Sequence, residues 1–196
     1  MISYPRKQIY LLCDERMYKH KPFSERPKQD APVERPERAI ALKKRLDEID
    51  RRLTNEHMKY MLNSSASEMV SRIELPKLLP SQYSSFVKIK CSPATEQDIT
   101  LVHSEEYYYS VKETETFSKK ELEKRNEEDS DIYYSNDTFL AATLAAGGTI
   151  KCVDSVFGNI SKRAIAIVRP PSHHARYDEA MGKQPIVFFK LSLIKI

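Results

Sequence analysis

A run of five apolar residues at 164–168 constrains the fold of this chain more than any other feature. The run is apolar on both faces and β-prone toward its carboxyl end, which is typical of a strand buried in a parallel sheet. A long apolar helix is predicted before it, opening at Asn136 and ending at Gly158 and Asn159. A helix followed by a buried strand indicates an α/β fold, in which ligands bind beyond the carboxyl ends of the strands. The loop after Val168 is therefore the first candidate for a site.

Local patterns predict the elements of the amino-terminal half. Short strands are expected at 8–13 and 86–90, and a long helix with a charged outer face is expected over 34–53. The prolines within 21–36 predict an irregular loop, because proline fixes φ and removes a backbone donor. The apolar face of the helix consists of four residues at helical spacing: Leu42, Leu46, Ile49 and Leu53.

The middle of the chain carries helix-start signals. Thr95 and Ser104 are predicted to cap the starts of two helices, and 119–131 is expected to be an exposed loop or a helix end. Two adjacent glycines, Gly147 and Gly148, lie inside the predicted apolar helix. Since glycine in a helix interior costs about 1 kcal/mol relative to alanine, this pair predicts close packing or a bend.

Composition excludes several classes of protein. The net charge of +4, from 32 basic and 28 acidic residues in 196, gives no signal for nucleic-acid binding. The three cysteines form no C-x-x-C pair, which argues against a disulfide framework and against a cysteine zinc knuckle. No window approaches 18 uncharged apolar residues, and the amino terminus has no secretory signal. We therefore expect an intracellular protein with no membrane span.

The loop after the buried strand carries the chemistry. Pro170 and Pro171 stiffen its start, and His173 and His174 follow directly. Imidazole exchanges a proton near neutral pH and is a common zinc ligand. From spacing alone, two readings stay open: a catalytic or ligating pair, or two hydrogen-bonded loop histidines without chemistry.

The residues of this loop resemble a known family. The segment 168–175, with the residues 178–182 that follow it, resembles the histidine loop of histone deacetylases, in the variant of the fungal class II enzymes. Further segments resemble the same family in the same order along the chain. They are Asp14 to Met17 with His20, Glu34 to Arg38, Ala94 with Thr95, Leu101 to Ser104 with Tyr107, Asp131 to Tyr133, Ala145 to Gly148, and Val153 to Val156.

The resemblance implies a fold and an activity. The fold would be the arginase–deacetylase type, a three-layer α-β-α arrangement with a parallel sheet, here incomplete. The activity would be zinc-dependent hydrolysis of N-acetyl-lysine on histones or other proteins, in chromatin regulation and transcription repression. His173 would support charge in the transition state, and His174 would act as general base. The resemblance also implies a nuclear or cytoplasmic location and subunits of chromatin complexes as partners.

The chain departs from the family pattern at the metal. The family's zinc ligands, an Asp-x-His pair and a later aspartate, would follow the histidine loop, as would its catalytic tyrosine. After His174 this sequence offers only Asp178 and Glu179 as carboxylates and no histidine, so we expect that this chain alone does not bind zinc. We interpret 1–182 as the amino-terminal portion of a deacetylase-like catalytic domain. The apolar segment 183–196 is interpreted as a divergent tail, from a frame change or a retained intron, or as a short terminal strand.

Smaller departures lie near the motif. Ser172 replaces a glycine, Arg176 and Tyr177 replace a glutamate–proline pair, and Pro32-Val33 stands in place of a histidine–proline pair. Serine at a position that needs an unusual φ would strain the loop. These changes would fit relaxed constraint on a non-catalytic copy.

Three hypotheses follow. In the first, the chain is part of a zinc-dependent lysine deacetylase and is inactive by itself. In the second, it is a non-catalytic interaction protein that binds partners through 34–53 and 111–131. In the third, it is a relative that acts on small acetylated amines. The strand at 164–168 is expected to have an unpaired edge, and exposed edges pair with other chains. We therefore expect the chain alone to be poorly stable or to aggregate.

Overall fold

The computed structural model describes residues 9–22, 34–63, 84–128, 132–171 and 175–180. Three parallel strands form its sheet in the order β2-β1-β3: β1 (Ile9–Cys13), β2 (Phe86–Ile89) and β3 (Ala164–Ile167). The helices are η1 (Glu15–Lys19), α1 (Pro36–Asn63), α3 (Glu96–Thr100), α4 (Glu105–Lys112), η4 (Glu113–Glu115), α5 (Lys119–Glu128) and α6 (Thr138–Phe157). All three predicted strands are confirmed, as is the parallel α/β arrangement.

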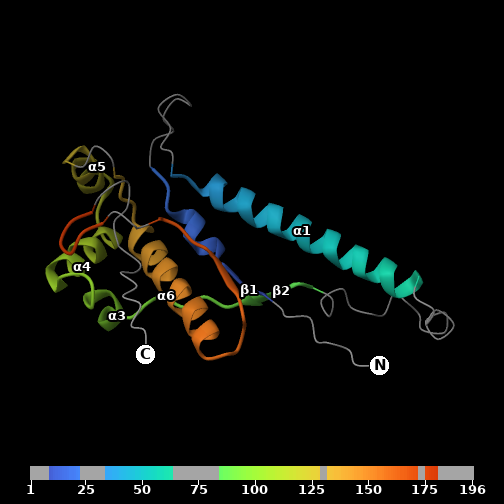
Figure 1. Cartoon of the computed structure of the whole chain (residues 1–196). Helices are drawn as coiled ribbons and strands as arrows, with labels where there is room; N and C mark the ends of the chain where they lie inside the picture. The colour runs from blue at the N-terminus through green and yellow to red at the C-terminus, as the bar shows by residue number, and fades with distance from the viewer. Residues whose placement is uncertain (1–8, 23–33, 64–83, 129–131, 172–174, 181–196) are drawn as a thin grey trace.

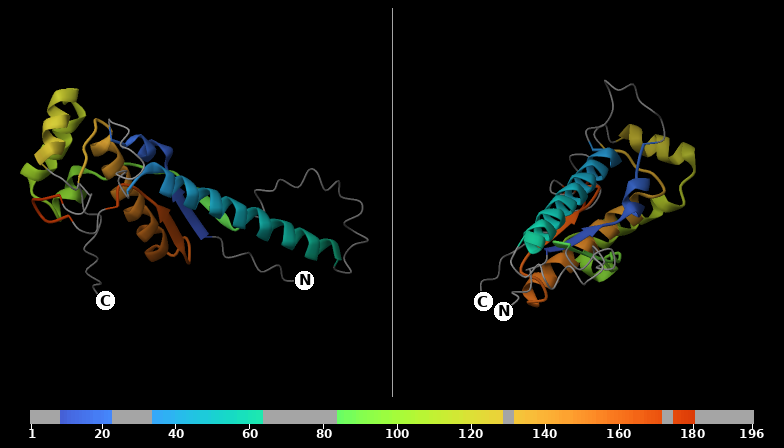
Figure 2. Two further views of the ribbon diagram at one scale, coloured as in Figure 1. Left: turned by 90° about the horizontal axis from the view of Figure 1, so that it is seen from above. Right: turned by 90° about the vertical axis from the view of Figure 1, so that its right-hand side faces the viewer.

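The sheet lies between two helices, as Figures 1 and 2 show. Successive residues of a strand point to opposite faces, so Leu11 packs with Ala39 of α1 while Leu12 packs with Leu144 of α6. Both leucines are buried, and full burial of such a side chain contributes about 2 kcal/mol. The central strand β1 is therefore the axis of the described core. Beyond α6, the helices α3 to α5 pack around a second cluster that includes Tyr108, Leu122 and Phe139.

Helix α6 confirms the prediction of close packing at its glycines. A Cβ atom on Gly147 would lie 2.1 Å from the carbonyl oxygen of Ser92, so only glycine fits beside the chain that leaves β2. The backbone N–H of Ala94 donates to the carbonyl of Thr143 across the same contact, at 2.8 Å. The helix ends at Gly158 as predicted, and Asn159 follows with φ of 56°.

Two predicted boundaries are wrong. Helix α6 begins at Thr138 instead of Asn136, because the Asn136 amide donates to carbonyls at the end of the α4–η4 segment, those of Thr114, Glu115 and Phe117. Helix α1 continues to Asn63, ten residues past the predicted end, and its last part extends beyond the sheet (Figure 1). Thr95 and Ser104 do cap α3 and α4, whereas 119–128 forms a regular helix.

Burial corrects two further expectations. The apolar face of α1 is only partly covered, since Leu42 is 59% exposed. In β3, only Ile167 is buried, because no strand covers its outer edge within the described ranges.

Helix α6 also changes the expectation about membrane spans. By length and composition it could cross a membrane, although 56% of its apolar window is buried inside the protein. A helix that packs against a sheet on one side and other helices on the other needs the same composition.

Candidate functional site

The candidate site lies in the loop that leaves the carboxyl end of β3. Residues 168–171 and 175–180 are described, and they form the two ends of this loop. The predicted catalytic residues His173 and His174, together with Ser172, lie outside the described residues. The described residues are therefore the two segments of chain that flank the histidine pair in sequence.

The entry to the loop is fixed by a buried ion pair. Arg169 follows β3 and is 2% exposed, and its guanidinium makes two parallel hydrogen bonds to Glu34, just before α1. Arg169 Nε donates to Glu34 Oε1 at 3.0 Å, and Nη2 donates to Oε2 at 2.9 Å. Bidentate pairing of this kind fixes orientation as well as charge. The pair is stable in the interior only if its remaining polar atoms are also satisfied.

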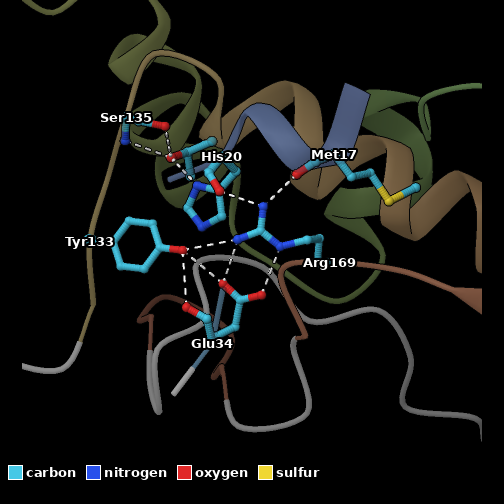
Figure 3. A network of polar contacts seen from close by, with 7 residues as sticks. Met17, His20, Glu34, Tyr133, Ser135 and Arg169 are labelled. Carbon is cyan, nitrogen blue, oxygen red and sulfur yellow. Dashed lines mark hydrogen bonds and ion pairs between the residues drawn. The ribbon is translucent and has the colours of Figure 1, made fainter. Parts of the chain in front are cut away.

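The other donors of Arg169 are all occupied, as Figure 3 shows. Nη1 donates to the carbonyl oxygens of Met17, at 2.7 Å, and of His20, while Nη2 also donates to the Tyr133 hydroxyl at 3.1 Å. Tyr133 in turn donates to Glu34 Oε2 at 2.9 Å. Guanidinium has five N–H groups, and five acceptor contacts meet them here. One side chain thus ties together the η1 segment, the start of α1, the segment before α6, and β3.

A neutral histidine completes this cluster. His20 is 1% exposed, its ring stacks on Tyr133 with centroids 4.5 Å apart, and its Nδ1 lies 3.0 Å from Thr138 Oγ1. Burial, assisted by the nearby Arg169 cation, lowers the pKa of His20 to about 3. Burial and the Glu34 carboxylate raise the pKa of the Tyr133 phenol far above its ordinary value. Both rings therefore stay uncharged at neutral pH and act as packing and hydrogen-bonding groups.

The exit from the loop is held differently. The carbonyl of Tyr177 accepts a hydrogen bond from the backbone N–H of Ser104 at 3.0 Å, and it lies 3.1 Å from His103 Nδ1. Since a carbonyl can only accept, this ring nitrogen is the donor. Arg176 and Glu179 close a turn by a backbone bond of 2.8 Å and an exposed ion pair of 3.3 Å. The exit is thus attached mainly through its backbone.

The three cysteines are not candidates for chemistry. Cys91 and Cys152 are buried in the core between β1 and α6, and burial raises the pKa of Cys91 to about 11. Burial also raises the pKa of Cys13 and of Cys152. Thiols that are protonated at neutral pH are poor nucleophiles and poor metal ligands.

The zinc ion implied by the family does not fit the donors described here. Among the described residues, no three side chains of histidine, cysteine, aspartate or glutamate gather closely enough to hold a metal ion. The local acids beside the loop are engaged elsewhere or exposed: Glu34 faces Arg169, and Glu179 faces Arg176.

Sequence reasoning missed the cluster around Arg169. Glu34, Tyr133 and Arg169 each stood in a segment that resembles the family, but no local pattern indicates that they meet. One signal was available in the sequence: Arg169 lies directly between an apolar strand and two prolines. An arginine at the end of a buried strand is itself expected to be buried, and a buried charge needs a partner of opposite charge.

The chain is similar to known proteins in sequence and in structure. The histone deacetylase domain family matches residues 34–183. The chain is 40% identical over 96 residues to a protein named histone deacetylase HDA1 of Candida albicans, covering 49% of this chain and 12% of the relative. It is 37% identical over 119 residues to a protein named polyamine deacetylase HDAC10 of Danio rerio, covering 56% and 18%.

A solved structure has the same fold. The crystal structure of the HDA15 HD domain superposes with a TM-score of 0.63 at 24% identity, covering 91% of this chain and 41% of that one. The chain thus spans less than a fifth of the length of the two curated relatives and under half of the solved domain.

Proposed function

Because this chain belongs to the histone deacetylase family, we propose that its protein hydrolyses the amide bond of N-acetyl-lysine in histones or other proteins, with the histidine loop as acid–base apparatus. The observation that carries the proposal is the family match over 34–183. That range includes the histidine loop and three members of the buried cluster: Glu34, Tyr133 and Arg169.

The chain's own residues would contribute a positioned proton acceptor. His174 would take the proton from the attacking water and return it to the leaving amine, and His173 would stabilise charge that develops on the acetyl oxygen. Such groups act efficiently only when held in place, since an error of 1 Å can cost on the order of 100-fold in rate. The Arg169 cluster and the Tyr177 carbonyl would supply that rigidity at the two ends of the loop.

Metal ligands would have to come from outside the described residues. We also propose that these 196 residues need further protein residues for deacetylase activity, because the sequence after His174 supplies only Asp178 and Glu179 as carboxylates and no histidine. A nuclear or cytoplasmic location and association with chromatin complexes belong to the same proposal.

Small acetylated amines are a second candidate substrate class. The match to a protein named polyamine deacetylase supports it, while the match to HDA1 supports acetyl-lysine in histones. The fungal class II character of 168–182 leads us to favour the protein substrate.

The test begins with sequencing of the transcript beyond the codon for Ile196. The chain and any longer product are then purified and incubated with an acetylated histone-tail peptide and with N-acetylputrescine, and the products are quantified by mass spectrometry. We expect the longer product to deacetylate the peptide in preference to the amine, and H174A to abolish this. The matched control is H57A, since His57 lies outside every segment of the proposed site.

Three outcomes would contradict the proposal. Hydrolysis unchanged by H174A would remove the histidine loop from the mechanism. Preference for N-acetylputrescine would favour the small-amine reading. A message that ends after Ile196, with no activity, would leave a non-catalytic interaction protein.

A further inference from the structure

The segment that brings Tyr133 to Arg169 presents alternate residues to two sides. Ile132 and Tyr134 are buried in the second core cluster, that of α3 to α5. Tyr133 lies between them in sequence, but its hydroxyl is 3.1 Å from Arg169 Nη2. In an extended chain, a shift of one residue moves every side chain to the opposite side. The contact of Tyr133 with Arg169 therefore depends on the register of 132–135.

A single side chain of α5 fixes this register. Asn126 Oδ1 accepts a hydrogen bond from the backbone N–H of Tyr134, and Asn126 Nδ2 donates to the carbonyl of the same residue at 3.2 Å. A backbone N–H can only donate and a carbonyl can only accept, so both ends of the side-chain amide match their partners. Asparagine is also one of the weaker helix formers, and this contact accounts for its place inside α5.

Neighbouring contacts support the hold of Asn126 on Tyr134. The Arg125 guanidinium lies over the Tyr134 ring, 5.3 Å from its centroid. Tyr134 and Leu122 of α5 are fully buried in the same core cluster. At the other end of the segment, the Asn136 amide donates to carbonyls within 114–117. The segment is thus attached to the region of α4 and α5 at both of its ends.

These contacts connect an outer helix with the entry of the histidine loop. Helix α5 lies beyond α6, apart from the strands (Figure 1), whereas the Arg169 cluster lies where β3 ends. Asn126 holds the backbone of Tyr134, and the adjacent Tyr133 places its hydroxyl between Glu34 and Arg169 (Figure 3). Arg169 in turn directly precedes the two prolines at the start of the loop.

We propose that Asn126 is a positioning residue for the histidine loop. By fixing the register of 132–135 it holds the Tyr133 hydroxyl on Arg169, and thereby holds Arg169 at the entry of the loop. The effect on catalysis rests on the proposed deacetylase function, whereas the effect on Tyr133 does not. Because Asn126 acts through Tyr133, substitutions at these two positions should not have independent effects.

The first test follows His20 by NMR, because its ring stacks on Tyr133 with centroids 4.5 Å apart. The full 196-residue chain is labelled with carbon-13 in its histidine rings, and H20F identifies the His20 resonance. We expect N126A to move this resonance in the same direction as Y133L does, because Tyr133 leaves its place beside the ring. E127A is the matched control and should leave the resonance in place, since Glu127 is the next residue on α5 and is exposed.

A milder variant guards against loss of the fold. N126D keeps the acceptor for the Tyr134 N–H but places an oxygen against the Tyr134 carbonyl, so it should move the His20 resonance in the same direction by a smaller amount. Circular dichroism and thermal melting check that each variant is folded. A His20 resonance that stays in place in folded N126A or N126D, or that E127A moves equally, would overturn the proposal. Loss of folding in both variants would also overturn it, since Asn126 would then hold the whole domain.

The second test measures deacetylation of the histone-tail peptide by whichever product is active. We expect N126A to lower kcat at least about tenfold and to change KM less than about twofold, because the loop geometry is altered and peptide binding is not. Y133F should lower kcat as well, and N126A/Y133F should lose no more than Y133F alone. A general loss of stability would not produce this non-additive result in folded enzyme. Additive losses of kcat, or a change confined to KM, would overturn the proposal.

The two tests separate this proposal from the proposed function. If no product deacetylates the peptide but N126A moves the His20 resonance as expected, the proposed function fails and Asn126 remains the residue that positions Tyr133. If a product loses its activity in H174A but keeps it in N126A, the proposed function stands and the positioning role of Asn126 is wrong.

Discussion

The two ends of the histidine loop are held by different means. At the entry, Arg169 is 2% exposed and is fixed through its side chain by groups from three other segments of the chain. At the exit, the side chains of Arg176 and Tyr177 are exposed, and the attachment passes through the carbonyl of Tyr177. The entry therefore depends on which residues are present, whereas the exit depends mainly on the path of the backbone.

This difference gives the departures from the family pattern a physical interpretation. Arg176 and Tyr177 replace a glutamate–proline pair, but both side chains point to solvent, and Arg176 meets the local Glu179 at 3.3 Å. The reversed charge is thus balanced on the surface. In contrast, Arg169 is buried, and its guanidinium pairs with the equally buried Glu34. The expected departures at 176 and 177 therefore leave the contacts of Arg169 at the entry untouched.

The largest effect is expected from R169M. It leaves the Glu34 carboxylate buried without its partner, which typically costs about 3–5 kcal/mol. Urea unfolding of the whole chain measures the loss, and the double variant R169M/E34M should recover a large part of it because no unpaired charge remains. A loss below about 1 kcal/mol would show that the entry is not held by this ion pair.

The second-largest effect is expected from acidification, which should lower the free energy of unfolding through His20. The pKa of His20 is about 3 in the folded chain and about 6.5 when unfolded, so between these values the unfolded state binds a proton that the folded state does not. Stability is therefore full above pH 6.5 and falls as pH decreases, by about 2 kcal/mol at pH 5. Urea unfolding at pH 7.5, 6 and 5 measures the slope. H20F, whose ring can still stack on Tyr133, should reduce the dependence of the unfolding free energy on pH. An equal slope in this variant would contradict the assignment of the pH dependence to His20.

A smaller loss is expected from Y133F. The phenylalanine ring keeps the stacking on His20 but removes a hydroxyl that accepts from Arg169 and donates to Glu34. Losing one such buried contact costs about 1–2 kcal/mol. Thermal unfolding compares it with Y177F, which should be neutral because Tyr177 is 61% exposed. Equal losses of thermal stability in Y133F and Y177F would contradict the claim that side chains hold the entry and the backbone holds the exit.

The sequence predicted the features that depend on neighbouring residues. Thr95 bonds its own helix start, and Gly158 ends α6, so each is visible in a short window. The Asn136 boundary failed because its partners lie about twenty residues away, at 114–117. The Arg169 cluster joins residues separated by 36 to 152 positions. No local pattern encodes such contacts, and only the fold brings them together.

The smallest effect is expected from R176A at the exit. Its ion pair with Glu179 is exposed on both sides, with side-chain exposures of 65% and 58%, and such pairs contribute about 0–1 kcal/mol. We expect a change in unfolding free energy within about 0.5 kcal/mol, because the backbone bond from Arg176 to Glu179 remains. Added salt should make this change smaller still, since it screens the ion pair in the unsubstituted chain. R169M measured in parallel provides the contrast. A loss at Arg176 comparable to that at Arg169 would mean that both ends are held through side chains, and the tolerance of the exit to substitution would need another cause.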